Sequence, residues 1–123
     1  MDPINYKKKQ ADILVNLLSS RKYEDVIRKA KPLIKKFPKD YIFYNAVGMA
    51  LINLEKYDDA LKILNEAMKL GENNIFVLNN LGLAHHFLKN FETAEACFIR
   101  ILKIKKDYLN AFINYSNLKK FLH

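Results

Sequence analysis

Among the side chains that could bind a metal or act as nucleophiles, His85, His86 and Cys97 lie within the chain's apolar stretches. The two histidines are adjacent, so on a helix they point about 100° apart and cannot chelate one metal as an i, i+4 pair does. We expect His85 to face the core and His86 a binding surface. Cys97 has no histidine or acid at a spacing that would activate its thiolate. We therefore predict no metal site, no cofactor and no catalytic activity.

The strongest chemical signal is positive charge, because 21 Lys and Arg against 13 Asp and Glu give a net charge of +8. Two basic stretches could meet nucleic acid or an anionic surface. They comprise Arg28, Lys29, Lys31, Lys35, Lys36 and Lys39, and then Lys103, Lys105 and Lys106. Arginine is scarce, and no aromatic residues alternate with the basic ones in the manner that stacks bases. A solvated face is therefore the favoured interpretation, with electrostatic binding as an alternative.

The elements that must carry these residues recur with a period of 34. Shifting residues 41–74 by that amount places Gly48 on Gly82 and Ala60 on Ala94, and the turn segments at 21–25, 55–59 and 89–93 align without insertion. Within each period, apolar residues recur at helical spacing. The pattern predicts helices over residues 5–19, 23–37, 41–54, 58–70, 75–88, 92–104 and 108–121, with Gly71 as a helix C-cap and Pro32 ending or bending the second helix.

The order of residues within one period resembles the tetratricopeptide repeat. Tyr44, Gly48, Tyr57, Ala60 and Ala67 form its signature, and Gly82, Phe91 and Ala94 repeat it. The resemblance implies an all-α fold, a right-handed α-α superhelix of about seven antiparallel helices. It implies one domain over residues 1–123, with repeats at about 7–40, 41–74 and 75–108 and a capping helix at 109–121.

Composition agrees with a single domain that has one continuous core. The lone Cys97 excludes an internal disulfide and suits a reducing compartment. No apolar run approaches the ~20 residues that span a bilayer, and Asp12 and Asn16 interrupt the first apolar stretch, which argues against a signal peptide. We expect a soluble, cytoplasmic protein without membrane contact.

The resemblance also implies that one side of each first helix lines a concave groove. Seven of the thirteen asparagines fall on this side, and most of the other residues there are apolar. A side-chain amide offers both a donor and an acceptor to a peptide backbone. We predict a peptide-binding groove formed by Asn45, Met49, Ile52, Phe76, Asn79, Asn80, Leu83, His86, Ile113 and Asn114.

The predicted function is a non-catalytic scaffold that binds a peptide or helix of another protein in this groove. One alternative is the recognition arm of a larger enzyme or assembly, for example a transferase that carries such repeats. Members that grip a C-terminal carboxylate use lysine, arginine and asparagine at five positions. The matching residues here are Ala11, Val15, Ala46, Phe76 and Asn80, so that mode is disfavoured.

Two further expectations concern packing. Gly48 and Gly82 should let Ala60 and Ala94 approach closely. In the last helix, Ser116 and Lys119 stand where earlier repeats have Gly82 and His85, as in a solvating cap. Three apolar residues remain there: Phe112, Tyr115 and Leu122. Either they pack on the third repeat, or the chain is cut from a longer array, or it self-associates through this helix.

Overall fold

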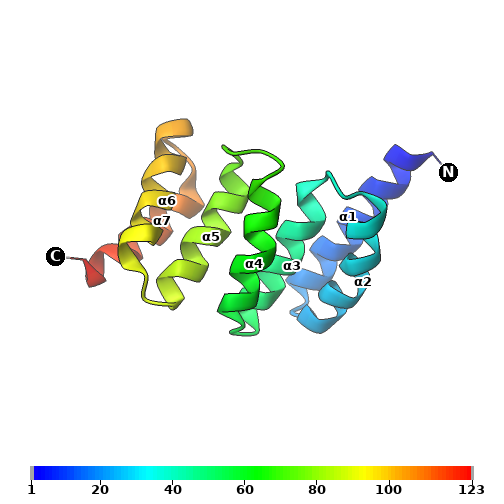
Figure 1. Ribbon diagram of the computed structural model, residues 1–123, viewed down its shortest axis with the longest axis horizontal. Coiled ribbons are helices and arrows are strands. Elements are labelled where there is room, and N and C mark those ends of the chain that lie inside the picture. The colour runs from blue at the N-terminus through cyan, green and yellow to red at the C-terminus, as the bar shows by residue number, and fades with distance from the viewer. Residues whose placement is uncertain (1, 123) are drawn as a thin grey trace.

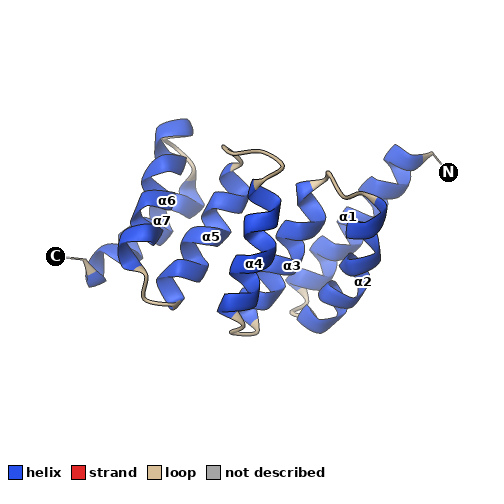
Figure 2. Ribbon diagram, in the orientation of Figure 1, coloured by secondary structure: helices blue, strands red, loops and turns tan. Residues whose placement is uncertain are grey.

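The computed structural model describes residues 2–122, which form seven α-helices and one short 3-10 helix, and no strand occurs in this range. Successive helices are antiparallel and stand side by side along one axis, with the two chain ends at opposite ends of the stack (Figures 1 and 2). The helices are α1 (Pro3–Ser19), α2 (Tyr23–Lys36), α3 (Tyr41–Asn53), α4 (Tyr57–Met68), α5 (Ile75–Phe87), α6 (Phe91–Ile104) and α7 (Leu109–Leu118), followed by η1 (Lys119–Phe121). The predicted fold class is confirmed, and the predicted helices are correct to within a few residues.

The inner helices α1, α3, α5 and α7 contact one another along the stack, whereas each outer helix packs between consecutive inner ones. Three inner helices begin at a capping side chain. Asp2 accepts a hydrogen bond from the backbone N–H of Asn5, Asp40 from that of Ile42, and Asn74 from those of Phe76 and Val77. Because a cap satisfies backbone N–H groups that have no helical partner, these side chains fix where the inner helices start.

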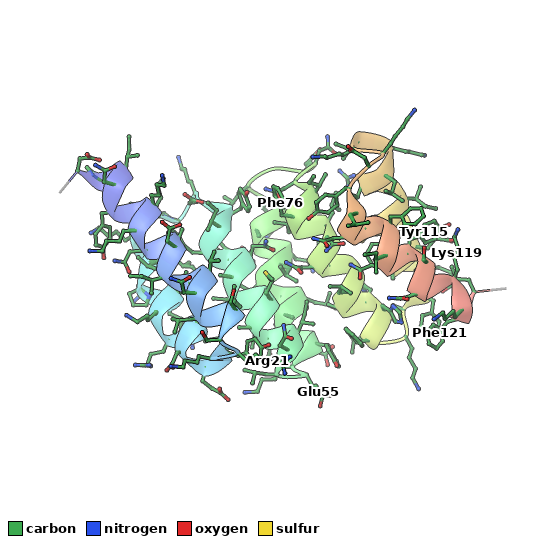
Figure 3. The ribbon with its side chains drawn as sticks, turned by 180° about the vertical axis from the view of Figure 1, so that it is seen from behind. Arg21, Glu55, Phe76, Tyr115, Lys119 and Phe121 are labelled. Carbon is green, nitrogen blue, oxygen red and sulfur yellow. The ribbon has the colours of Figure 1, made fainter. Side chains whose placement is uncertain are left out.

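The turns inside the repeats share a backbone conformation that the sequence did not reveal. Arg21, Glu55 and Lys89 have φ of 58°, 61° and 65°, and they are 34 residues apart. After each, a backbone N–H returns to the preceding helix, as from Lys56 to Leu51 O at 2.8 Å. This is the Schellman arrangement, in which glycine usually occupies the left-handed position. Figure 3 shows Arg21 and Glu55 on the same edge of the stack.

The core consists of three apolar clusters, centred on the contacts of α1–α3, α3–α5 and α5–α7. Two glycines mark the closest approach between inner and outer helices. A Cβ on Gly48 would overlap the Leu64 side chain, and one on Gly82 would lie 2.5 Å from Cε1 of Phe98. The predicted partners Ala60 and Ala94 are fully buried. The glycines, however, make room for the bulky residues one turn further along α4 and α6.

One local prediction was wrong, and one of the two alternatives for another is excluded. Gly71 does not cap α4, because the cap is Lys69 in ordinary helical conformation and Gly71 has no positive φ. Pro32 does not end α2, which continues to Lys36. Since the exposed Pro32 lies ten residues into the helix, α2 keeps its remaining bonds and its buried face of Val26, Ala30 and Leu33.

The two ends of the stack are anchored differently. α1 has 17 residues but buries only Leu14. At the other end, Tyr115 and Leu122 pack against the third cluster, as one of the alternatives anticipated, whereas Phe112 remains 59% exposed. Ser116 and Lys119 are exposed, as expected for a cap. None of the described helices is long and apolar enough to cross a membrane.

Candidate binding groove

The inner helices present a row of large apolar side chains to solvent. Met49 is 36% exposed and Phe76 is 47% exposed. They are joined by Val15, Ile42, Phe87, Ile113 and Phe121, all exposed. Single exposed apolar residues are ordinary, but Val15, Ile42, Met49 and Phe76 gather around one cavity, and such a cluster is typical of an interaction surface.

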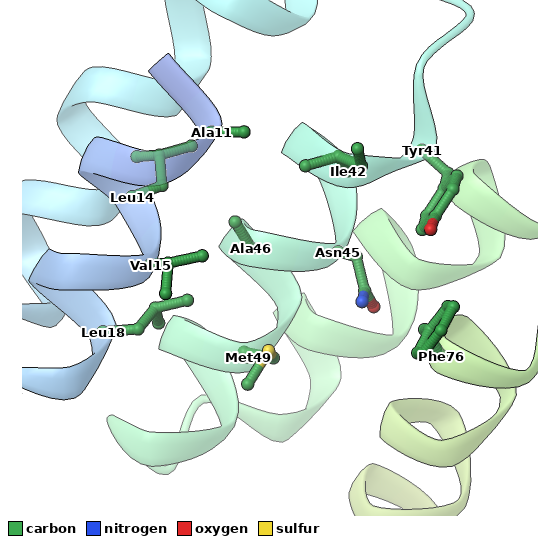
Figure 4. Close-up of a pocket in the computed structure, with 10 residues that line it drawn as sticks. All are labelled: Ala11, Leu14, Val15, Leu18, Tyr41, Ile42, Asn45, Ala46, Met49 and Phe76. Atoms are coloured by element: carbon green, nitrogen blue, oxygen red, sulfur yellow. The ribbon is translucent and has the colours of Figure 1, made fainter. Parts of the chain in front are cut away.

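Part of this surface is a cavity of about 210 Å³ between α1, α3 and α5. Figure 4 shows Leu14, Val15 and Leu18 on α1 opposite Met49 on α3, with Phe76 of α5 on the far side. The other lining residues are Ala11, Tyr41, Ile42, Asn45 and Ala46. None of the lining residues is charged, so this cavity favours an apolar, uncharged group.

The asparagines of the groove pair with each other across neighbouring helices. Nδ2 of Asn80 donates to Oδ1 of Asn45 at 2.9 Å, and Nδ2 of Asn114 donates to Oδ1 of Asn79 at 2.9 Å. Asn79 and Asn80 are only 8% and 6% exposed. The amides are therefore not a free row as expected, because each pair already uses one donor and one acceptor to join two inner helices.

Each pair still keeps hydrogen-bonding capacity. An amide nitrogen has two hydrogens and an amide oxygen has two lone pairs, so one bond leaves the remainder available. No buried side-chain nitrogen or oxygen in the described part of the chain lacks a partner, so the amide atoms outside these two bonds, such as Oδ1 of Asn80 and Nδ2 of Asn79, keep some contact with solvent. Two such pairs, one repeat apart, stand along the groove with both functions still on offer.

Aromatic rings run along both edges of the groove. On the edge nearest the inter-repeat loops, Tyr41 and Phe76 stack with centroids 6.4 Å apart, and Phe76 meets Tyr108 edge-on at 6.0 Å. On the opposite edge, Phe87 stacks on Tyr57 at 5.1 Å, and Phe121 stacks on Phe91 at 5.3 Å. Tyr41 and Tyr108 were not among the predicted groove residues, although their aromatic type directly before or at the start of inner helices was a usable signal.

His86 lies inside the second aromatic edge, between Phe87, Phe91 and Phe121 at centroid distances of 5.5, 5.9 and 5.3 Å. Burial among these rings lowers the pKa of His86, and burial likewise lowers the pKa of His85. His85 Nδ1 is 3.3 Å from the side-chain nitrogen of Asn90. Packing thus favours the neutral form of both imidazoles.

The remaining predicted groove residues divide into two groups. Met49, Phe76 and Ile113 are exposed on the inner surface, and Leu83 is half-buried there. Ile52 is 8% exposed and belongs to the middle core cluster, so its side chain is not on offer in the groove as predicted. The prediction failed at Ile52 because spacing along one helix does not show what neighbouring helices cover, and Ile52 shares its cluster with Leu64 of α4 and Leu81 of α5.

Several residues of the repeat signature lie in the core or bond to a loop. Ala60, Ala67 and Ala94 are fully buried, and Tyr44 donates a hydrogen bond of 2.7 Å from its hydroxyl to Pro38 O. Burial raises the pKa of the Cys97 thiol, with Arg100 acting weakly in the opposite direction. Among the described residues, no group of three His, Cys, Asp or Glu side chains could hold a metal ion.

Comparisons with known proteins agree with this architecture. Two relatives match in sequence, and the chain spans 10% of the length of each. Protein O-mannosyl-transferase Tmtc3 of Drosophila melanogaster is 29% identical over 89 residues, or 61% of this chain. The TPR repeat-containing protein MJ1428 of Methanocaldococcus jannaschii is 41% identical over 56 residues, or 46% of this chain.

Solved structures share the fold at low identity. The first TPR domain of human RPAP3 has a TM-score of 0.86 at 18% identity, and the alignment covers 92% of this chain and 89% of that one. The Arabidopsis OM64 TPR domain has a TM-score of 0.85 at 16% identity, with coverage of 94% and 95%. The family model described as tetratricopeptide repeat matches residues 41–74 and 77–108, and the chain belongs to this family.

Proposed function

We propose that this chain is a non-catalytic protein-interaction module that binds a segment of a partner along the groove of α1, α3, α5 and α7. The observation that carries the proposal is the uncharged apolar cavity, which is lined by exposed large apolar side chains such as Met49 and Phe76. Burying such surface contributes about 25 cal/mol per Å², which gives a short segment a favourable reason to bind. The amide pairs would supply orientation through bonds to its backbone.

Two solved relatives of the fold are named for complexes with peptides. The first TPR of Spaghetti (RPAP3), with a TM-score of 0.82 at 19% identity, is bound to the HSP90 peptide SRMEEVD, and the second TPR domain of human RPAP3 is in complex with the HSP70 peptide SGPTIEEVD. Both peptides are acidic. At positions that the family resemblance matches to a carboxylate clamp, this chain has Ala11, Val15, Ala46 and Phe76, which line the cavity without a cation. We infer that this groove takes an apolar, uncharged segment instead.

A binding experiment tests the proposal directly. A peptide array that contains uncharged apolar sequences and SRMEEVD is probed with the labelled chain and with Met49→Glu. Met49 is exposed, so a glutamate there should leave the fold intact while placing a charge in the cavity. Selective binding of apolar peptides, lost in Met49→Glu but kept in the distant control Lys62→Glu, is the expected result. Preference for SRMEEVD, or binding that Met49→Glu does not alter, contradicts the proposal.

Each of two alternative functions is favoured by one specific observation. The chain spans a small part of its sequence relatives, one of which is a transferase, so it could serve as the recognition arm of a larger enzyme. The exposed lysines of α2 could bind nucleic acid or an anionic surface, although Arg28 pairs with Asp25, and Lys36 lies 4.2 Å from the Tyr6 ring centroid. Heparin binding that vanishes steeply with salt would favour the electrostatic alternative. A cytoplasmic location and self-association through α7 remain predictions.

A further inference from the structure

A second apolar surface lies at the C-terminal end of the stack and is separate from the groove. It consists of Leu109, Phe112 and Ser116 on one side of α7, with Lys119 at its end; we refer to it as the α7 surface. Leu109 is 65% exposed and Phe112 is 59% exposed. Within the described chain α7 packs on α5, α6 and η1, and none of these covers the α7 surface.

The chain itself shows what kind of element fits such a surface. The counterparts one repeat earlier are Ile75, Leu78 and Gly82, of which Leu78 is 3% exposed and Gly82 is buried. There α6 supplies the cover, with the Phe98 ring against Gly82. At the α7 surface the exposed Ser116 stands in the place of Gly82, and its hydroxyl donates back to Phe112 O at 2.9 Å.

The outer helices share a pattern that defines the complementary element. Each buries residues at i, i+4 and i+7: Val26, Ala30 and Leu33 in α2; Ala60, Leu64 and Ala67 in α4; Ala94, Phe98 and Ile101 in α6. Each also has acidic side chains in its first turn, as with Asp58 and Asp59 in α4. Because an outer helix runs antiparallel to its inner partner, its first turn lies close to the end of the inner helix.

Charge around the α7 surface selects an acidic partner over a second copy. Lys119 and Lys120 follow the end of α7, and Lys103, Lys105 and Lys106 precede it, against two acids, Asp107 and the Glu95 that binds Tyr115. Two copies meeting tail to tail would bring these lysines together. A head-to-tail contact is no better matched, since α1 exposes mainly polar side chains such as Lys9, Asp12 and Asn16. A helix with an acidic first turn would instead face Lys119 favourably.

We propose that the α7 surface binds an amphipathic helix of a partner protein, with apolar residues at i, i+4 and i+7 and acidic residues in its first turn. Lys119 is already positioned for this role, since its ammonium lies 4.7 Å from the ring centroid of Tyr115, whose hydroxyl donates to Glu95 at 3.0 Å. Figure 3 shows Tyr115 and Lys119 together at this end of the stack. This binding mode resembles helix-in-groove recognition.

The test uses two synthetic alanine-rich helical peptides with leucines at i, i+4 and i+7, one with Asp-Glu and one with Lys-Lys in the first turn. Fluorescence anisotropy with the whole chain should show binding of the acidic peptide only. Phe112→Asp should weaken it at least about tenfold, as loss of a central apolar anchor does. Lys119→Glu should transfer the preference to the Lys-Lys peptide, whereas Met49→Glu in the groove should change neither affinity. Circular dichroism confirms that each variant is folded.

Three outcomes would overturn the proposal. The acidic peptide could fail to bind the wild-type chain, or it could bind Phe112→Asp equally well. In the third outcome, sedimentation shows that the wild-type chain is a dimer. Phe112→Asp dissociates this dimer, whereas the acidic peptide does not, which assigns the α7 surface to self-association. Because Met49→Glu is the separate control for the groove, failure here leaves the groove proposal standing.

Discussion

The side-chain amide of Asn80 in α5 donates a hydrogen bond of 2.9 Å to Oδ1 of Asn45 in α3, and Asn114 in α7 makes the same bond to Asn79 in α5. Both bonds join residues 35 apart, so the second is the first moved along by one repeat. The pairs tie α3 to α5 and α5 to α7 on the groove side of the core. Asparagines that the sequence suggested as ligand-binding groups therefore also connect neighbouring helices through hydrogen bonds.

The first prediction follows from these hydrogen bonds. Asn80→Ala should lower the free energy of unfolding by about 1–3 kcal/mol, because it removes a buried hydrogen bond and leaves Asn45 without its partner. Urea denaturation measures the change. Asn110→Ala is the matched control, since Asn110 is exposed and no side-chain hydrogen bond of its own is seen. Equal stability of the two variants would show that the Asn45–Asn80 bond adds nothing to the fold.

A second prediction concerns the left-handed turns. Glu55 has φ of 61°, a conformation that costs a residue with a Cβ about 1–2 kcal/mol and glycine almost nothing. Glycine also adds conformational entropy to the unfolded chain, which offsets part of this gain. Glu55→Gly should therefore stabilise the protein by about 0.5–1 kcal/mol. Thermal melting tests it, with Lys62→Gly in the interior of α4 as the control that should destabilise, since Lys62 is exposed. A lower melting temperature for Glu55→Gly would argue against strain at this turn.

The third prediction concerns the two glycines of the core. Gly82→Ala should destabilise by about 1–3 kcal/mol, despite the better helix propensity of alanine, because its Cβ would overlap the fully buried Phe98 ring. Gly71→Ala should have little effect, since a Cβ there meets nothing within 4 Å. Chemical denaturation of both variants gives the comparison. Adding Phe98→Leu to Gly82→Ala should recover part of the lost stability. If it does not, the destabilisation arises from a contact other than that with Phe98.

The fourth prediction is a pH dependence with a definite sign. Burial lowers the pKa of His85 and His86 in the folded chain from the usual value of 6.5, so the unfolded chain binds protons more readily. Their contribution is therefore intact above about pH 6.5, and stability falls as the pH drops below that value. Urea midpoints at about pH 7.5 and pH 5.5 measure it. The double variant His85→Leu/His86→Ile carries the residues found at these positions in the preceding repeat. Its stability should decrease less between the two pH values. If the decrease is unchanged, it arises from other titratable groups.

Much of the fold was predictable because the 34-residue period appears directly in the residue types. Gly48 and Gly82, with Ala60 and Ala94, placed the helices in register, since a small residue is required wherever two helices approach closely. The partner of each glycine was not predictable in the same way. Whether a gap is filled by Ala94 or by Phe98 depends on the rotation of one helix against the other, which a repeat pattern does not specify.

The groove was predictable as a surface but not in its contacts. Spacing along a helix places Met49, Phe76 and Ile113 on one side, and the structure shows them exposed there. The pairing of Asn79 with Asn114 depends on the distance between two helices, which lies outside any single-helix argument. The left-handed Arg21, Glu55 and Lys89 were missed because residue type gives no sign of that conformation when glycine and asparagine are both absent.

The long first helix has a consequence for how the cavity can open. α1 forms one wall of the cavity through Val15 and Leu18, yet Leu14 is the only side chain that it buries completely. Partial detachment of α1 should therefore require less free energy than any other large fluctuation of the molecule. Amide hydrogen exchange should accordingly be faster in α1 than in the other six helices. Such a movable wall would let the cavity admit side chains larger than its resting size while the remaining helices stay in place.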